Sequence, residues 1–188
     1  MRFIEHRNLS GLHAPFSPSQ SSWLRYDDEK ALEVLANKRA AEMGTRLHEW
    51  AKQTIDLGIK QPRSNKTLYS YVNDAIGYKM STEVVLYYSD RFFGTADAIS
   101  FRNNTLRIHD LKTGKVGKIE SHLEQLQIYA ALFCLEYKIK PGDIRIELRV
   151  YKTDEVVCNT PTAEDILPIM DKIIHLDKLM TQAEFEED

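Results

Sequence analysis

Apolar and charged residues alternate at helical spacing along the first part of the chain, from Ala31 to Leu57, where Gly58 ends the pattern. The segment Ser17–Gln20 supplies a helix start upstream of this pattern. Residues 58–67 contain proline, asparagine and several charges, which predicts a loop. A second helix, weakened by an internal glycine, is predicted from Leu68 to Met80.

Three runs rich in Val, Ile, Leu, Phe and Tyr follow, at Glu83–Tyr88, Phe92–Phe101 and Leu106–Leu111. Short polar segments, Ser89-Asp90 and Asn103-Asn104, separate these runs. Because short polar connections of this kind join neighbouring strands, the pattern predicts three consecutive antiparallel strands.

The next apolar residues recur at steps of three and four along the chain, at Ile119, Leu123, Leu126, Ala130 and Phe133. This spacing predicts an amphipathic helix that ends before Pro141-Gly142. From Asp143 to Tyr151 apolar and polar residues alternate again, which predicts a further strand.

A stripe of Ile, Leu and Met residues predicts a last helix from Thr162 to Met180. Pro168 is compatible with this helix if Asp165 caps it, because the proline then falls within the first turn. Residues Ala183–Asp188 are expected to form a frayed acidic tail.

The predicted elements follow the order helix, three strands, helix, strand, which favours an α/β fold with a helical N-terminal region and a C-terminal helix. A chain of 188 residues, 43% of them hydrophobic, is long enough for one domain with a sizeable core and short for two. We expect a single domain over residues 1–188, helical over about 17–80 and with the sheet and its helices over about 81–182.

Charge, cysteine content and hydrophobic runs bear on nucleic-acid binding, disulfide bonds and membrane insertion. The net charge of -3 gives no overall basic field, so contact with nucleic acid has to come from a local patch. Cys134 and Cys158 lie far apart and in no metal-ligand spacing, so a disulfide framework is not expected. The start of the chain, Met1–Leu12, has no apolar run, and no stretch is long enough to span a bilayer. We therefore expect a cytoplasmic protein without a membrane partner.

The predicted hairpin gathers charged residues. If Asn103-Asn104 forms a two-residue turn, Asp97 lies directly opposite Asp110, and Lys112 joins the same face. Two opposed carboxylates repel each other unless a cation lies between them. A solvated hairpin face without function is the usual meaning of an isolated D-x-K, so the interpretation depends on the rest of the sequence.

Five short motifs occur together in a fixed order, and through them the sequence resembles the RecB-like branch of the PD-(D/E)XK nuclease superfamily. The motifs are Gly44-Thr45-Arg46-Leu47-His48, Glu83, Gly94-Thr95-Ala96-Asp97, Asp110-Leu111-Lys112-Thr113-Gly114 and Gln125-Leu126-Gln127-Ile128-Tyr129. The resemblance implies a restriction-endonuclease-like core, αβββαβ with a mixed sheet.

The resemblance also implies a metal site. Similar enzymes bind Mg²⁺ or Mn²⁺ through the positions of His48, Asp97 and Asp110 and the backbone carbonyl of Leu111. Lys112 is expected beside the attacking water, where a compact cation stabilises the transition state. Taken alone, a histidine on a helix is more often a surface or core residue than a ligand.

The resemblance implies three further site residues. Glu83 faces the cluster only if the turn at Ser89–Arg91 has three residues, and is otherwise an exposed carboxylate. Gln125 and Tyr129, four residues apart on one helix face, mark the active site in the family, where they contact a phosphate or hold Lys112. Without the resemblance they would be ordinary helix residues.

A DNA path is suggested by basic residues around this acidic centre. Arg46, Lys115 and Lys118 would contact phosphates, although each is also explained as solvated charge. Two cysteines cannot supply the four ligands of the cluster found in many RecB-like nucleases, so no iron-sulfur cluster is expected. The chain also has no phosphate loop of a helicase motor. It resembles stand-alone nucleases of phage replication and recombination systems, which act in the host cytoplasm, and small organellar exonucleases.

The leading hypothesis is a Mg²⁺- or Mn²⁺-dependent exonuclease that hydrolyses phosphodiester bonds at DNA ends, single- or double-stranded, in replication, recombination or repair. The preference for an exonuclease over a structure-selective endonuclease comes from family analogy. A third alternative is a non-catalytic DNA-binding subunit that keeps the fold. A homo-oligomer and a recombination or replication partner protein are both compatible with the sequence, which gives neither polarity nor strand preference.

Overall fold

The computed structural model describes residues 14–18, 21–114, 118–152 and 155–187, with side chains as far as residue 184. The chain forms two compact units, Met1–Thr45 and Arg46–Asp188. The first unit contains the short 3-10 helix η2 (Ser21–Arg25) and the beginning of helix α1 (Asp28–Asp56). The carboxylate of Asp27 caps α1 by accepting a hydrogen bond of 2.8 Å from the backbone N–H of Lys30. Part of the helix start predicted at Ser17–Gln20 lies outside the described residues.

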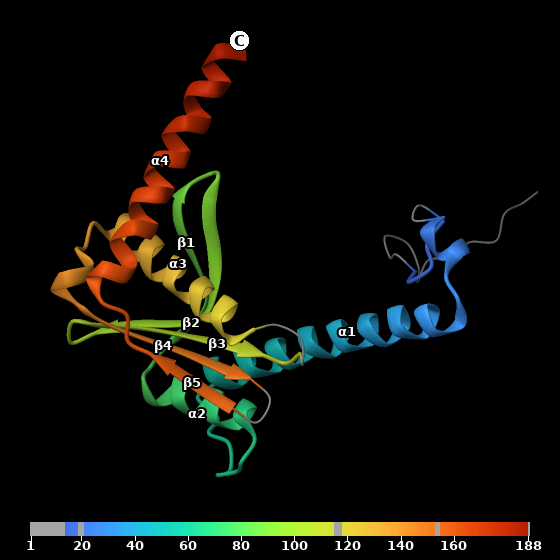
Figure 1. Ribbon diagram of the computed structural model, residues 1–188. Helices are drawn as coiled ribbons and strands as arrows, with labels where there is room; N and C mark the ends of the chain where they lie inside the picture. Colours follow the sequence, from blue (N-terminus) through green and yellow to red (C-terminus); the bar gives the residue numbers. More distant parts are fainter. Residues whose placement is uncertain (1–13, 19–20, 115–117, 153–154, 188) are drawn as a thin grey trace, which may run out of the picture. The chain divides into compact units, whose positions relative to one another are not determined.

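A five-stranded mixed sheet in the order β1-β2-β3-β4-β5 forms the centre of the second unit (Figure 1). Its strands are β1 (Ser81–Ser89), β2 (Phe92–Arg102), β3 (Thr105–Lys112), β4 (Arg145–Lys152) and β5 (Glu155–Asn159). β1, β2 and β3 pair antiparallel, β3 and β4 pair parallel, and β4 and β5 pair antiparallel. The predicted fold class, a mixed α/β sheet with an N-terminal helical region and a C-terminal helix, is confirmed. β5 was not predicted, since its five residues are too few for a clear alternation.

Helices cover both faces of this sheet. α3 (Ile119–Tyr137) and α4 (Ala163–Glu187) pack on one face, which buries Leu106, Ile108 and Leu148. The end of α1 and helix α2 (Thr67–Gly77) pack on the other face, against Leu111 and Tyr151. Figure 1 shows α3 and α2 on opposite sides of the strands. A one-turn helix, η3 (Pro141–Asp143), leads from α3 into β4. None of the described helices is both long and apolar enough to cross a bilayer.

The last helix differs from its prediction in two ways. Thr162 lies before its first residue, and the Asp165 carboxylate accepts a hydrogen bond of 2.7 Å from the Thr162 backbone N–H. Asp165 is therefore the third helical residue, and Pro168 lies inside the helix rather than in its first turn. The helix also continues to Glu187, so the acidic segment predicted to be frayed is helical as far as the description extends.

The turn between β2 and β3 has the predicted two residues. Asn103 and Asn104 have φ angles of 50° and 55°, as a type I′ hairpin turn requires. The paired residues run from Arg102 and Thr105 to Ala98 and His109. The turn thus sets the register that the sequence predicted.

Changing the turn should change stability in proportion to its backbone strain. Asn103→Val places a β-branched residue at positive φ and should lower the free energy of unfolding by about 1–2 kcal/mol. Asn103→Gly removes that strain and should leave stability unchanged or slightly higher. Urea denaturation of the two variants measures this difference, and equal stability would contradict the turn assignment.

His109 is fully buried between Tyr78 and Tyr151, with ring centroids 5.8 Å and 5.3 Å away. Burial, followed by the charges of Arg149 and Arg107, lowers the pKa of His109 to about 3 from its ordinary value of 6.5. The unfolded chain therefore binds a proton below about pH 6.5 that the folded protein does not take up until about pH 3.

Stability should accordingly fall as the pH is lowered from about 6.5 towards 3, by up to about 1.4 kcal/mol per pH unit from His109. His109→Gln should lose this part of the slope, whereas His175→Gln, at an exposed position on α4, should keep it. Free energies of unfolding measured between pH 5 and 7 provide the test. Identical slopes for His109→Gln and the wild type would show that the folded protein already accepts this proton.

Candidate functional site

The candidate site lies where β2 and β3 stop pairing. The ladder between these strands ends at Ala98 and His109, one residue short of Asp97 and Asp110. Beyond that point, the Asp97 carboxylate accepts a hydrogen bond of 3.0 Å from the backbone N–H of Leu111. β3 continues by pairing with β4 as far as Lys112, and β2 stays paired with β1, so both aspartates lie on strands that remain in the sheet.

The alternation of side chains changes phase at Asp97. Ala96 packs in the core beneath α3, whereas Ala98 packs in the core against α1 and α2. In a regular strand, residues two apart would face the same side. Glu83, which lies opposite Asp97 in the β1–β2 register, has a φ of 52°, a left-handed conformation that costs about 1–2 kcal/mol outside glycine. Such strain concentrates at functional sites.

The β1–β2 connection explains how Glu83 reaches this register. The strands turn through Asp90 and Arg91, and an irregularity between Tyr87 and Ser89 shifts the pairing by one residue. The connection is therefore neither a regular two-residue loop nor a regular three-residue loop. The shift nevertheless places Glu83 opposite Asp97, as a three-residue loop would have done. The Glu83 side chain is exposed.

The surroundings of Asp97 disfavour its ionised form. Burial, followed by the neighbouring charge of Asp110, raises the pKa of the Asp97 carboxyl. The Leu111 N–H, His48 and Lys112 oppose this shift. His48 Nδ1, on α1, lies 3.5 Å from Asp97 Oδ2.

Asp110 is more deeply buried, with 3% of its surface exposed. Its Oδ1 accepts a hydrogen bond of 2.9 Å from the Lys112 ammonium. Its Oδ2 is buried and has no hydrogen-bond partner among the described residues. An unsatisfied carboxylate oxygen of this kind is costly for a protein, and a bound cation would satisfy it.

α3 supplies two contacts that order the site. Gln125 Oε1 accepts a hydrogen bond of 3.1 Å from Lys112 Nζ, which therefore bridges Gln125 and Asp110. The Tyr129 hydroxyl donates a hydrogen bond of 2.7 Å to the Thr95 carbonyl. A Cβ at Gly94 would come within 2.9 Å of Tyr129 Cε1, so the glycine allows the ring to lie against β2.

Tyr71, on α2, is a site residue that the sequence did not reveal. It is 3% exposed, and burial raises the pKa of its hydroxyl. The charges of Asp97, Asp110 and Glu83 raise this pKa further, so these carboxylates lie within electrostatic reach of the hydroxyl. No spacing in the sequence links Tyr71 to the motifs, because only the packing of α2 on the sheet brings it there.

The predicted metal ligands are only partly gathered. Within the described ranges, no group of three or more His, Cys, Asp and Glu side chains is placed so that it could hold a metal ion. His48 contacts Asp97, and Asp97 lies close to Asp110, but the three do not form a closed set of ligands. Asp97 and Asp110 supply carboxylate oxygens, the donor type that suits a hard cation.

Two of the three predicted DNA-binding residues are described, and both lie at the surface. Arg46 is exposed on α1, and Lys118 is exposed immediately before α3. Lys115 lies outside the described residues.

Two hollows flank the site. One, of about 280 Å³, includes Gly94, Gln125 and Tyr129 in its lining, and the other, of about 210 Å³, includes Leu111 and Lys112.

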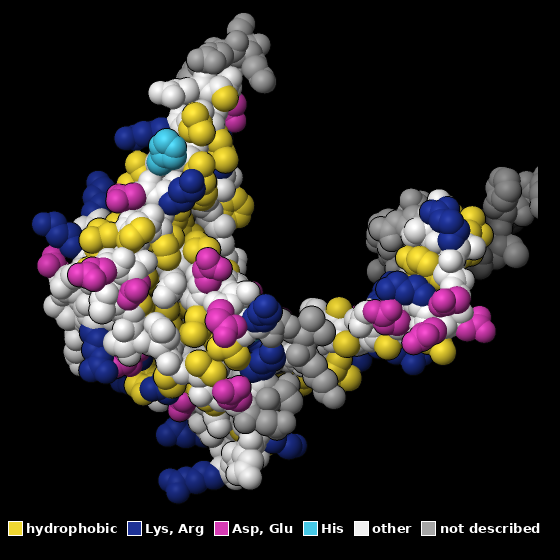
Figure 2. Space-filling view, viewed as in Figure 1, with side chains coloured by type: hydrophobic (Ala, Val, Ile, Leu, Met, Phe, Trp, Pro, Cys, Tyr) yellow, Lys and Arg dark blue, Asp and Glu magenta, His cyan; other side chains and the backbone are white. Residues whose placement is uncertain are grey.

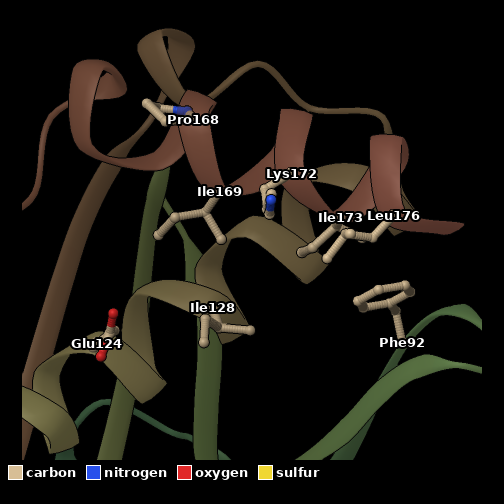
Figure 3. Close-up of a pocket in the computed structure, with 8 residues that line it drawn as sticks. All are labelled: Phe92, Glu124, Ile128, Pro168, Ile169, Lys172, Ile173 and Leu176. Atoms are coloured by element: carbon tan, nitrogen blue, oxygen red, sulfur yellow. The ribbon is translucent and has the colours of Figure 1, made fainter. Parts of the chain in front are cut away.

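A larger hollow of about 640 Å³ lies between α3, α4 and the start of β2 (Figure 3). It is lined mainly by apolar side chains and contains none of the predicted site residues. Figure 2 shows hydrophobic side chains along α4.

Comparisons with known proteins add one finding. A family model described as "Protein of unknown function (DUF2800)" matches residues 80–145, less than half of the chain. The matched segment contains Glu83, Asp97, Asp110, Lys112, Gln125 and Tyr129 and excludes His48. No curated protein matches the chain.

The contact between Gly94 and Tyr129 can be tested by adding one methyl group. Gly94→Ala should lower the free energy of unfolding by about 1–3 kcal/mol, because the Tyr129 ring has to move. Gly77→Ala is a matched control, since no heavy atom lies within 4 Å of its added Cβ. Replacing Tyr129 by Leu in the Gly94→Ala variant should recover part of the loss. Purely additive effects in urea denaturation would contradict this packing.

Proposed function

We propose that this protein is a metal-dependent deoxyribonuclease of the RecB-like PD-(D/E)XK kind, and that it degrades DNA from its ends. The observation that carries the proposal is the pair Asp97 and Asp110 beside Lys112, with one buried oxygen of Asp110 left without a hydrogen-bond partner among the described residues. Its proposed location is the cytoplasm, or the host cytoplasm if a phage encodes it.

The residues present suit Mg²⁺ or Mn²⁺. Mg²⁺ is usually bound by one or two carboxylates, with water and substrate phosphate completing its coordination. The raised pKa of Asp97 is what two neighbouring buried carboxylates produce when no cation separates them. Asp97, Asp110 and the Leu111 carbonyl would hold the ion. His48, whose Nδ1 lies next to Asp97, would add a nitrogen ligand if its side chain moved towards the ion.

The side chains around this position have separable tasks. A bound divalent ion would polarise a phosphate oxygen and lower the pKa of a coordinated water. Lys112 places a positive charge where the phosphoryl group gains negative charge, and Gln125 fixes the position of its ammonium. Tyr129 fixes β2 through the Thr95 carbonyl and thereby helps to position Asp97.

The direct test is digestion of end-labelled linear DNA with Mg²⁺ or Mn²⁺. Asp110→Asn and Lys112→Gln should each lower kcat by about 10²–10³-fold, because each removes a charge that acts on the reacting phosphate. EDTA should abolish digestion by the wild type. Asp143→Asn and Lys140→Gln, at exposed positions beyond the other end of β4, are matched controls that should retain activity.

Circular single-stranded DNA separates the two nuclease classes. An enzyme that requires ends should leave the circle intact, whereas cleavage of the circle would identify an endonuclease. Digestion at wild-type rates by both Asp110→Asn and Lys112→Gln would refute the proposed site. DNA binding without digestion by any form would favour a non-catalytic subunit.

A further inference from the structure

A second basic residue lies next to Lys112. Lys112 and Lys152 are paired in the parallel register of β3 and β4, at the end of both strands. Ile146, Leu148 and Val150 of β4 pack in the core beneath α3, so alternation places Lys152 on the α3 face. Lys112 contacts Gln125 of α3 on that same face.

His122, in the first turns of α3, approaches the same point. Burial and the charges of Lys112 and Lys152 lower the pKa of His122, and Asp110 opposes this shift. These groups therefore lie within electrostatic reach of its imidazole. The Nε2 atom of His122 is buried and has no hydrogen-bond partner among the described residues. An imidazole N–H at this position can donate a hydrogen bond to a ligand oxygen.

Two cations and an imidazole side by side are unfavourable by themselves. Like charges directly opposed on neighbouring strands repel each other. Two carboxylates moderate this repulsion: Asp110 is bonded to Lys112, and the exposed Glu155 lies opposite Lys152 in the β4–β5 register. An anionic ligand with several oxygen acceptors would contact both ammonium groups and reduce the repulsion between them.

We propose that Lys152 and His122 bind the phosphate group that neighbours the scissile phosphate on the same DNA strand. This subsite rests on the proposed nuclease function, in which Lys112 acts at the scissile phosphate. Neighbouring strands lie about 4.8 Å apart, so Lys112 and Lys152 are spaced closely enough for one nucleic-acid strand to contact both. The ligand is either an internal phosphodiester or a terminal phosphate, which share the same oxygen chemistry.

Binding can be measured without cleavage. Fluorescence anisotropy with a labelled single-stranded oligonucleotide in EDTA should show that Lys152→Gln weakens binding about 3–10-fold and lowers the salt slope by about 1. His122→Gln should also weaken binding, with a smaller change in the salt slope. Lys140→Gln and His175→Gln, which replace the same residue types at exposed positions elsewhere, should bind as the wild type does.

Neutral linkages locate the phosphate. In a series of oligonucleotides, each with one phosphate replaced by a neutral methylphosphonate, one position should weaken binding to the wild type about as much as Lys152→Gln does. The same replacement should have no further effect on binding to the Lys152→Gln protein. Oligonucleotides with and without terminal phosphates then distinguish a terminal group from an internal one.

The outcomes separate the two proposals. The subsite is overturned by any of three results. The Lys152→Gln and His122→Gln proteins could bind DNA as tightly as the wild type does, the effects of the methylphosphonate and of Lys152→Gln could be additive, or the wild type could fail to bind DNA. If the wild type cleaves DNA but these results are negative, only the subsite fails. If the subsite results are positive but no DNA is cleaved, phosphate binding stands and the nuclease assignment fails.

Discussion

The proximity of two carboxylates, Asp97 and Asp110, is the constraint on which the rest of the site depends. Burial of Asp97, followed by the neighbouring charge of Asp110, raises the pKa of the Asp97 carboxyl. The fold nevertheless holds both in place. The β2–β3 ladder brings the chain to within one residue of both, the Leu111 N–H donates to one oxygen of Asp97, and Lys112 donates to one oxygen of Asp110. The remaining oxygen of Asp110 has no partner among the described residues, and this is the observation on which we base the proposal of a bound cation.

The two helical layers around the sheet serve different parts of the site. α3 brings Gln125 to Lys112 and Tyr129 to the backbone of β2, so it orders the cationic side. α1 and α2 bring His48 and Tyr71 to the carboxylates from the other layer. Groups from both helical layers therefore surround the pair Asp97 and Asp110.

Local signals explain what could be predicted from the sequence. The Asn103-Asn104 turn and the alternation around it were sufficient to predict three strands and the β2–β3 register. Features set by tertiary packing were not accessible in this way. Tyr71 and His122 reach the site only because their helices pack on the sheet, and the left-handed conformation of Glu83 leaves no trace in the spacing of residues. Pro168 was predicted in the first turn of the last helix but lies inside it. The sequence did not show that the helix already begins at Ala163, directly after Thr162.

Manganese binding tests the central claim most directly, because Mn²⁺ scatters X-rays anomalously and replaces Mg²⁺ at oxygen sites. Crystals soaked in Mn²⁺ should show an anomalous peak between Asp97 and Asp110, about 2.1 Å from an oxygen of each. The Asp110→Asn protein, soaked in the same way, should show a much weaker peak. An empty position between two well-ordered carboxylates in the wild type would contradict the account.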